Sequence, residues 1–162
     1  MNKESFEREK IITDEFRKIS HLYIPKMEIF PYAGKFVRRY EYINGTTIRK
    51  IKPKIVKEMT PDWAHSIAKF LFEIGMYDPK TLYKYKTDKN AKPGYMYGWY
   101  HGDIYDNFMI DKKTNKILAV FDWEDVRFDD FSNIFQSKYP DQNEFMQAVR
   151  IEYDKIYKKS CK

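Results

Sequence analysis

The sequence predicts an α+β fold in which residues 1–162 form a single domain. Three segments repeat apolar residues at helical spacing, and the runs between them are rich in the β-branched and aromatic residues typical of strands. The 162 residues are 43% hydrophobic, which is enough to form one packed core. We therefore expect a mostly helical chain with small antiparallel sheets.

The first helix is predicted to begin at Ser5, a residue type that often caps helix N-termini. Its apolar stripe consists of Phe6, Ile11, Ile12, Phe16 and Ile19. Two strand-like runs, "PKMEIF" and "KFVRRYEYI", then flank "YAG" and predict a β-hairpin. The Asn44-Gly45 pair after them predicts a turn.

A second helix is predicted to start at Thr60-Pro61, because Thr caps helices and Pro fits the first turn, and to end at Gly75. Its apolar face consists of Trp63, Ile67, Phe70, Leu71 and Ile74. Residues 77–97 read as a solvated loop whose lysines are Lys84, Lys86, Lys89 and Lys92. We keep open the alternative that these lysines bind an anionic substrate or a phosphate.

Two further elements complete the predicted fold. "FMID", "KKTNK" and "ILAVFDW" predict a strand hairpin, and residues 145–157 predict a closing helix. The apolar face of that helix consists of Phe145, Val149, Tyr153 and Ile156.

Composition restricts the classes of partner. The formal charge is +6, but the 24 acidic residues are spread among the 30 basic ones, so we do not expect nucleic-acid binding. The single cysteine, Cys161, excludes a disulfide framework or a cysteine-based zinc cluster within the chain. The sequence shows neither an apolar signal region nor a run that could span a bilayer, and we expect a soluble, cytoplasmic protein without membrane contacts.

The stretches "WYHGDIYDNFMID" and "AVFDWED" carry the chemistry. An Asp on a loop, an Asn within the next turn, a hairpin and then a second Asp form a phosphoryl-transfer arrangement. Asp103 would accept the proton of a substrate hydroxyl, while Asn107 and Asp122 would hold Mg²⁺ against the phosphates of ATP. In the simpler alternative Asp103 closes a turn, and Asp122 and Asp125 are surface acids at the end of a hairpin.

In order and strand context, "HGD…N" and "FDWED" resemble the motifs of the aminoglycoside phosphotransferase and choline kinase group of kinase-like enzymes. The resemblance implies transfer of the ATP γ-phosphoryl group to a hydroxyl of a small molecule. It also implies that Glu41, Tyr42 and Ile43 form the hinge whose backbone meets adenine, with Tyr40 at the entrance to the pocket behind it. Residues 1–43 would be a remnant of the N-lobe with the hinge, and residues 44–162 a kinase-like C-lobe.

The sequence departs from the family pattern in ways that affect function. We expect no Gly-rich phosphate loop and no strand lysine before Ser5. Glu9, at the position of the ion-pairing Glu of the family, then lacks a lysine partner and is predicted to be solvated. Asn107 follows Asp103 by four residues where the family usually has five, so Asp106 is an alternative metal ligand.

These features leave two hypotheses. In the first, the chain is a phosphotransferase that is weak or inactive alone because the phosphate-covering parts are missing. In the second, it is a non-catalytic kinase-like module that acts through a protein partner. In either case we expect a partner or a second copy of the chain to cover the place of the missing strands.

Overall fold

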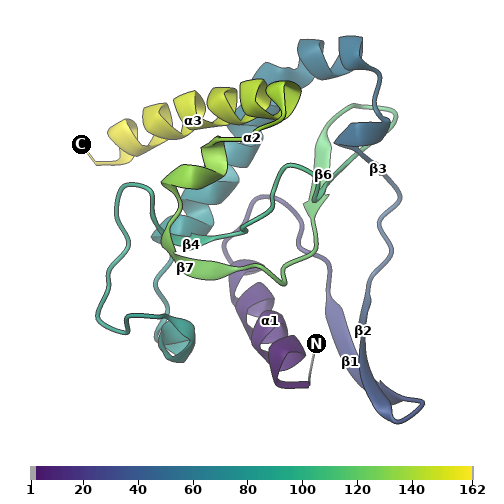
Figure 1. The fold of residues 1–162 in the computed structure, drawn as a ribbon, viewed down its shortest axis with the longest axis vertical. Helices are drawn as coiled ribbons and strands as arrows, with labels where there is room; N and C mark the ends of the chain where they lie inside the picture. The colour runs from purple at the N-terminus through teal and green to yellow at the C-terminus, as the bar shows by residue number, and fades with distance from the viewer. Residues whose placement is uncertain (1–2, 162) are drawn as a thin grey trace.

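The computed structural model describes residues 3–161, which form a mixed helical and stranded fold, as the sequence predicts (Figure 1). The elements in chain order are α1 (Lys3–Phe16), β1 (Met27–Tyr32), β2 (Lys35–Tyr40), β3 (Thr46–Thr47), α2 (Pro53–Met76), β4 (Tyr97–Tyr100), β5 (Phe108–Ile110), β6 (Ile117–Val120), β7 (Arg127–Asp130) and α3 (Pro140–Ser160). Short 3₁₀ helices cover Ile48–Lys50, Lys80–Tyr85 and Ser132–Phe135.

Figure 1 shows how these elements form layers around one core. α3 lies along α2 at one end of the molecule, and α1 lies at the other end beside the projecting β1–β2 hairpin. The antiparallel pair β4–β7 and the three-stranded sheet β3–β5–β6 lie between them. Trp123 is buried in this core, with the rings of Phe16 and Phe70 at centroid distances of 5.6 and 5.7 Å. Both helical layers therefore pack against the segment that follows β6.

The predicted β1–β2 hairpin is confirmed. Its register pairs Met27 with Tyr40 and Tyr32 with Lys35, so only two residues form the loop. Both of them, Ala33 at φ 47° and Gly34 at φ 75°, have a positive φ, as a two-residue hairpin loop of type I′ requires.

Three predicted helix and turn boundaries are wrong. Ser5 lies inside α1 and does not cap it. α2 begins eight residues before Pro61, at Pro53, which itself fits a first helical turn. Thr60 lies within the helix, where its hydroxyl donates to the Val56 carbonyl at 2.7 Å instead of capping an N-terminus. The Asn44-Gly45 segment forms neither a turn nor a strand and leads directly into β3.

The remaining helix predictions are confirmed in position and in their buried faces. α2 ends at Met76, one residue after the predicted Gly75, and all five residues of its predicted apolar face are buried. α3 contains the predicted segment 145–157, and Phe145, Val149 and Tyr153 on it are buried. Within residues 3–161, none of the helices combines the length and the apolar character needed to cross a bilayer.

Lys86 corrects the prediction of a solvated lysine loop. Its side chain is fully buried, pairs with the Asp78 carboxylate and donates to the Ala91 carbonyl at 2.9 Å. Its ammonium group also lies 4.1 Å from the centroid of the Phe128 ring. Lys86 therefore anchors the segment between α2 and β4 and is not available to an anionic substrate.

We expect Lys86→Met to destabilise the protein by about 2 kcal/mol, because Asp78 loses its closest cation while it stays largely buried. Lys84→Met, which changes an exposed lysine two residues away, should cost much less. Urea unfolding of both variants measures the difference. Equal midpoints for the two variants would show that the buried pair contributes nothing.

Candidate active site

Two loops form the centre of the candidate site. The HGD loop, His101–Asp103, follows β4, and the DWED loop, Asp122–Asp125, follows β6. Gly102 has a φ of 69°, and a Cβ at this position would lie 2.7 Å from the carbonyl oxygen of Asp125. Only glycine therefore fits where the two loops touch. The two motifs that the sequence separates by some twenty residues are in backbone contact.

His101 fixes the HGD loop to the chain just before Asp122. It is buried, and its Nε2 donates to the Phe121 carbonyl at 2.8 Å, while its ring packs against Trp123 at a centroid distance of 4.7 Å. Through this hydrogen bond His101 has a structural role in the loop. Among the described residues, its buried Nδ1 has no partner, and burial lowers the pKa of His101 to about 4.

The depressed pKa of His101 predicts acid sensitivity. The unfolded chain binds this proton near pH 6.5 and the folded protein only near pH 4, so stability falls as the pH drops from about 6.5 to 4. The shift corresponds to roughly 3 kcal/mol at 1.36 kcal/mol per pKa unit. Urea unfolding at pH 7 and pH 4.5 should show that His101→Gln loses less stability between these pH values than the unmodified protein does. The Gln amide can donate the same hydrogen bond but does not titrate. Equal losses in both proteins would contradict this assignment.

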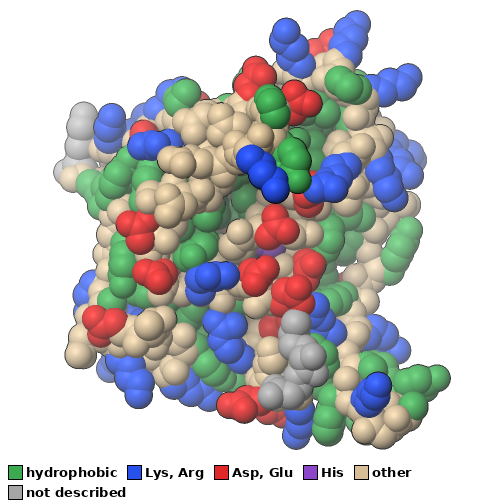
Figure 2. All heavy atoms as spheres, viewed as in Figure 1, with side chains coloured by type: hydrophobic (Ala, Val, Ile, Leu, Met, Phe, Trp, Pro, Cys, Tyr) green, Lys and Arg blue, Asp and Glu red, His purple; other side chains and the backbone are tan. Residues whose placement is uncertain are grey.

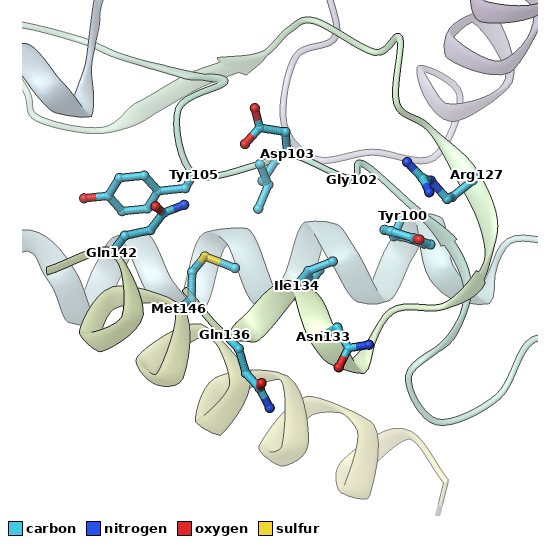
Figure 3. Close-up of a pocket in the computed structure, with 11 residues that line it drawn as sticks. Tyr100, Gly102, Asp103, Tyr105, Arg127, Asn133, Ile134, Gln136, Gln142 and Met146 are labelled. Atoms are coloured by element: carbon cyan, nitrogen blue, oxygen red, sulfur yellow. The ribbon is translucent and has the colours of Figure 1, made fainter. Parts of the chain in front are cut away.

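Asp103 stands at the rim of a cavity of about 310 Å³, named here the α3 cavity (Figure 3). Gln142 and Met146 of α3 line the side opposite Asp103, and Tyr100 and Arg127 line one end. The other lining residues are Gly102, Ile104, Tyr105, Asn133, Ile134 and Gln136. The pKa of Asp103 is raised, first by partial burial and then by the negative charges of neighbouring aspartates. A raised pKa suits a group that accepts a proton.

Asn107 and Asp106 occupy different settings. The side-chain nitrogen of Asn107 donates to the backbone carbonyl of Asp103 at 2.7 Å. The backbone carbonyl of Asn107 accepts from the Phe121 N–H at 2.9 Å. Asn107 thus lies beside the residue before Asp122, with its side-chain oxygen left as the possible ligand. The Asp106 carboxylate is held by two nitrogens of Arg49, with Nε at 2.6 Å. Of the two alternatives, this geometry favours Asn107.

Asp122 lines a second cavity, of about 590 Å³, together with the predicted hinge residues. The lining residues of this hinge cavity are Arg38, Tyr40, Glu41, Tyr42, Ile43, Met109, Phe121 and Asp122. Asp122 has a φ of 59°, a left-handed conformation that Asp and Asn tolerate better than most residues. Its side chain is 42% exposed, so the carboxylate is accessible from the cavity.

Glu9 corrects the prediction of a solvated helix charge. It is 1% exposed, and its carboxylate pairs with Arg38 and accepts a hydrogen bond from the Tyr40 hydroxyl. Burial and the bond to Glu9 raise the pKa of Tyr40. The sequence prediction considered only a lysine partner and missed Arg38. Strand alternation was the available signal, since Arg38 and Tyr40 lie two residues apart and therefore on one face of β2.

The surface around these loops is acidic although the chain is basic overall. Figure 2 shows Asp and Glu side chains gathered across the middle of one face, with Lys and Arg around them. Within residues 3–161, no group of three or more His, Cys, Asp or Glu side chains is arranged to hold a metal ion. Mg²⁺ that binds together with a nucleotide usually takes most of its ligands from phosphates and water.

No protein-family model and no curated protein matches the chain. Among solved structures, the ternary complex of streptomycin, ATP and the aminoglycoside phosphotransferase APH(2″)-IIa matches with a TM-score of 0.62. The match covers 95% of this chain and 70% of that chain, at 15% sequence identity. This chain has the kinase-like fold. The kinase-like fold that the motifs predicted is thereby confirmed, while 15% identity extends the likeness no further than the fold.

Proposed function

We propose that the protein is a phosphotransferase that moves the γ-phosphoryl group of ATP to a hydroxyl of a small molecule. One observation carries this proposal: the hinge cavity holds Asp122, the α3 cavity holds Asp103, and the loops bearing the two residues touch at Gly102. A nucleotide in the first cavity and a hydroxyl compound in the second would then meet between two carboxylates. The kinase-like fold, shared with an ATP complex, supports ATP as the donor.

The residues of the hinge cavity fit a nucleotide with its metal. Residues 41–43 lie outside the described strands. The Glu41 N–H donates to the Lys26 carbonyl at 3.1 Å, so the Glu41 carbonyl and the backbone groups of Tyr42 and Ile43 are the ones that can receive adenine. Asp122 and Asn107 offer one carboxylate and one amide oxygen to Mg²⁺. When bound, Mg²⁺ neutralises charge on the phosphates. Phosphates and water would supply its remaining ligands.

Asp103 performs the proton chemistry. Its carboxylate takes the proton of the acceptor hydroxyl as that oxygen forms its bond to the γ-phosphorus. The bond between the γ-phosphorus and the oxygen bridging to the β-phosphate breaks, and ADP leaves. Because partial burial and then the neighbouring aspartates raise the pKa of Asp103, its carboxylate is a stronger base than that of an ordinary Asp.

A second candidate function is a non-catalytic module that binds a protein partner. The observation that favours it is the β1–β2 sheet, which has two strands within the described residues and exposed aromatic side chains at Tyr32 and Phe36. Unpaired strand edges invite pairing with another chain. A second copy of the chain or a partner protein could extend this sheet, with or without a nucleotide bound.

Calorimetric titration of ATP with and without Mg²⁺ tests the proposal. We expect ATP to bind and Mg²⁺ to tighten the binding. Absence of ATP binding under both conditions would overturn the phosphotransferase proposal in favour of the partner-binding module.

A further inference from the structure

Arg38 is the cation of the hinge cavity. Of the described residues that line this cavity it alone has a positively charged side chain, whereas Glu41 and Asp122 are acidic. The Arg38 side chain is 19% exposed, and its guanidinium carbon lies 5.4 Å from the centroid of the Phe6 ring and 5.6 Å from that of Tyr40. A largely buried guanidinium between two aromatic rings has few positions open to it.

One end of the Arg38 guanidinium is anchored and the other faces the DWED loop. Nη1 pairs with Glu9, whose side chain is 2% exposed and is also bonded by Tyr40. Nη2 lies 3.1 Å from Glu124 and 3.5 Å from Asp122, whose side chains are 39% and 42% exposed. The anchor is therefore a buried pair, whereas both partners in the DWED loop are partly exposed to solvent and the contact to Asp122 is also long. Ion pairs with partly exposed carboxylates contribute little energy, so Nη2 can leave Glu124 and Asp122 for another acceptor.

The net charge of this cluster is negative, so the cluster favours an anion only when a cation binds together with it. Glu9, Asp122 and Glu124 contribute three negative charges and Arg38 one positive charge, a sum of −2. A bare triphosphate would be repelled, whereas Mg²⁺ at Asp122 would bring the sum to zero and weaken the attraction of the DWED loop for Nη2, which then depends on Glu124 alone. A guanidinium has five N–H donors, so Arg38 can keep Glu9 and still bind phosphate oxygens.

We propose that Arg38 is the phosphate-binding residue of this site, held by Glu9 and Tyr40, and that its Nη2 exchanges the DWED carboxylates for phosphate oxygens when ATP binds with Mg²⁺. This inference rests on the proposed function, because it assumes that ATP occupies the hinge cavity. It assigns the phosphate contact to β2, on which Arg38 lies two residues before the hinge-side Tyr40.

The test compares the affinities of ATP with Mg²⁺ and of adenosine, measured by calorimetry. Adenosine has no phosphates, so the ratio of the two affinities reports the phosphate contacts alone. Arg38→Met should lower ATP affinity by about 10–100-fold, the range expected when a charge-assisted hydrogen bond is lost, and leave adenosine affinity within about 2-fold. Arg38→Lys keeps the charge without the fork of donors and should give an intermediate ATP affinity. Arg39→Met, in which an exposed arginine paired with Glu28 on the same strand is changed, is the matched control.

Two safeguards keep the outcomes distinct. Because Arg38→Met leaves Glu9 buried and unpaired, the double variant Glu9→Gln/Arg38→Met, which removes both charges, is measured beside it. A role for Arg38 in folding alone would lower the melting temperature and leave the affinity ratio unchanged, which would overturn the inference. Normal ATP binding by the Arg38 variants would overturn the inference and leave the proposed function standing. Failure of the unmodified protein to bind either ATP or adenosine would overturn both.

Discussion

Asp103→Ala is expected to slow phosphoryl transfer to a hydroxyl acceptor by about 10²–10⁴-fold, the usual contribution of a positioned general base. The affinity for ATP should stay within about 2-fold, because Asp103 lines the α3 cavity and not the hinge cavity. Single-turnover assays with ATP, Mg²⁺ and a panel of small hydroxyl compounds measure the rate. We expect the rate of the unmodified chain to be low, because residues 3–161 contain no Gly-rich phosphate loop to hold the phosphates in line.

Asp129→Ala provides the control for Asp103→Ala. Asp129 is an exposed acid on β7, outside both cavities, so this variant changes the charge equally and should keep the full rate. If Asp103→Ala and the unmodified protein transfer phosphate at the same residual rate, Asp103 is not the base, and the partner-binding module becomes the better account.

Asp122→Asn is expected to abolish the dependence of ATP binding on Mg²⁺. Loss of an outer-shell partner alone typically lowers metal affinity by about 10–100-fold, so loss of the carboxylate ligand should cost at least as much. The fold should be unaffected, because Asn tolerates the left-handed conformation that Asp122 adopts at φ 59°. Calorimetry with and without Mg²⁺ measures the effect, and circular dichroism checks the fold.

Asp125→Asn is the matched control for Asp122→Asn. Asp125 lies in the same loop, but its side chain is 58% exposed and faces Arg127, with 3.8 Å between the nearest charged atoms. The atoms of Asp125 nearest Gly102 are its backbone carbonyl and its Cβ, which Asn retains. A full Mg²⁺ effect in Asp122→Asn, or an equal loss in both variants, would show that the metal site is misplaced.

The parts of the fold that sequence predicted well are those governed by local patterns. The β1–β2 hairpin follows from strand-like runs around a two-residue loop, and the buried faces of α2 and α3 follow from helical spacing. The start of α2 was missed because Thr60-Pro61 is a good start signal. Pro53 also fits a first helical turn, but Lys52 before it provides no side-chain cap, so the local signal there is weaker.

In the candidate site, too, the features that follow from a local motif were predicted and those that depend on distant residues were not. The "HGD" and "DWED" motifs carry enough pattern to predict the kinase-like fold, and Gly102 shows why the two loops must meet. The burial of Glu9 was not predictable from α1 alone, because its partner Arg38 lies 29 residues away on β2. Lys86 was misread for a related reason, since the Phe128 ring over it belongs to distant β7. Whether a charged residue is buried depends on partners that lie far away in the sequence. The sequence of the segment that contains the charged residue does not reveal these partners.

The most direct test of the central claim, that the hinge cavity and the two loops form one ATP site, is a nuclear magnetic resonance titration with ATP and Mn²⁺. We predict that ATP with Mg²⁺ shifts the amide signals of residues 41–43, and that Mn²⁺ in place of Mg²⁺ broadens those of residues 101–107 and 121–125. The signals of the last turns of α3, far from both cavities, should stay unchanged. Broadening elsewhere on the surface, with the hinge and the two loops unaffected, would contradict the account.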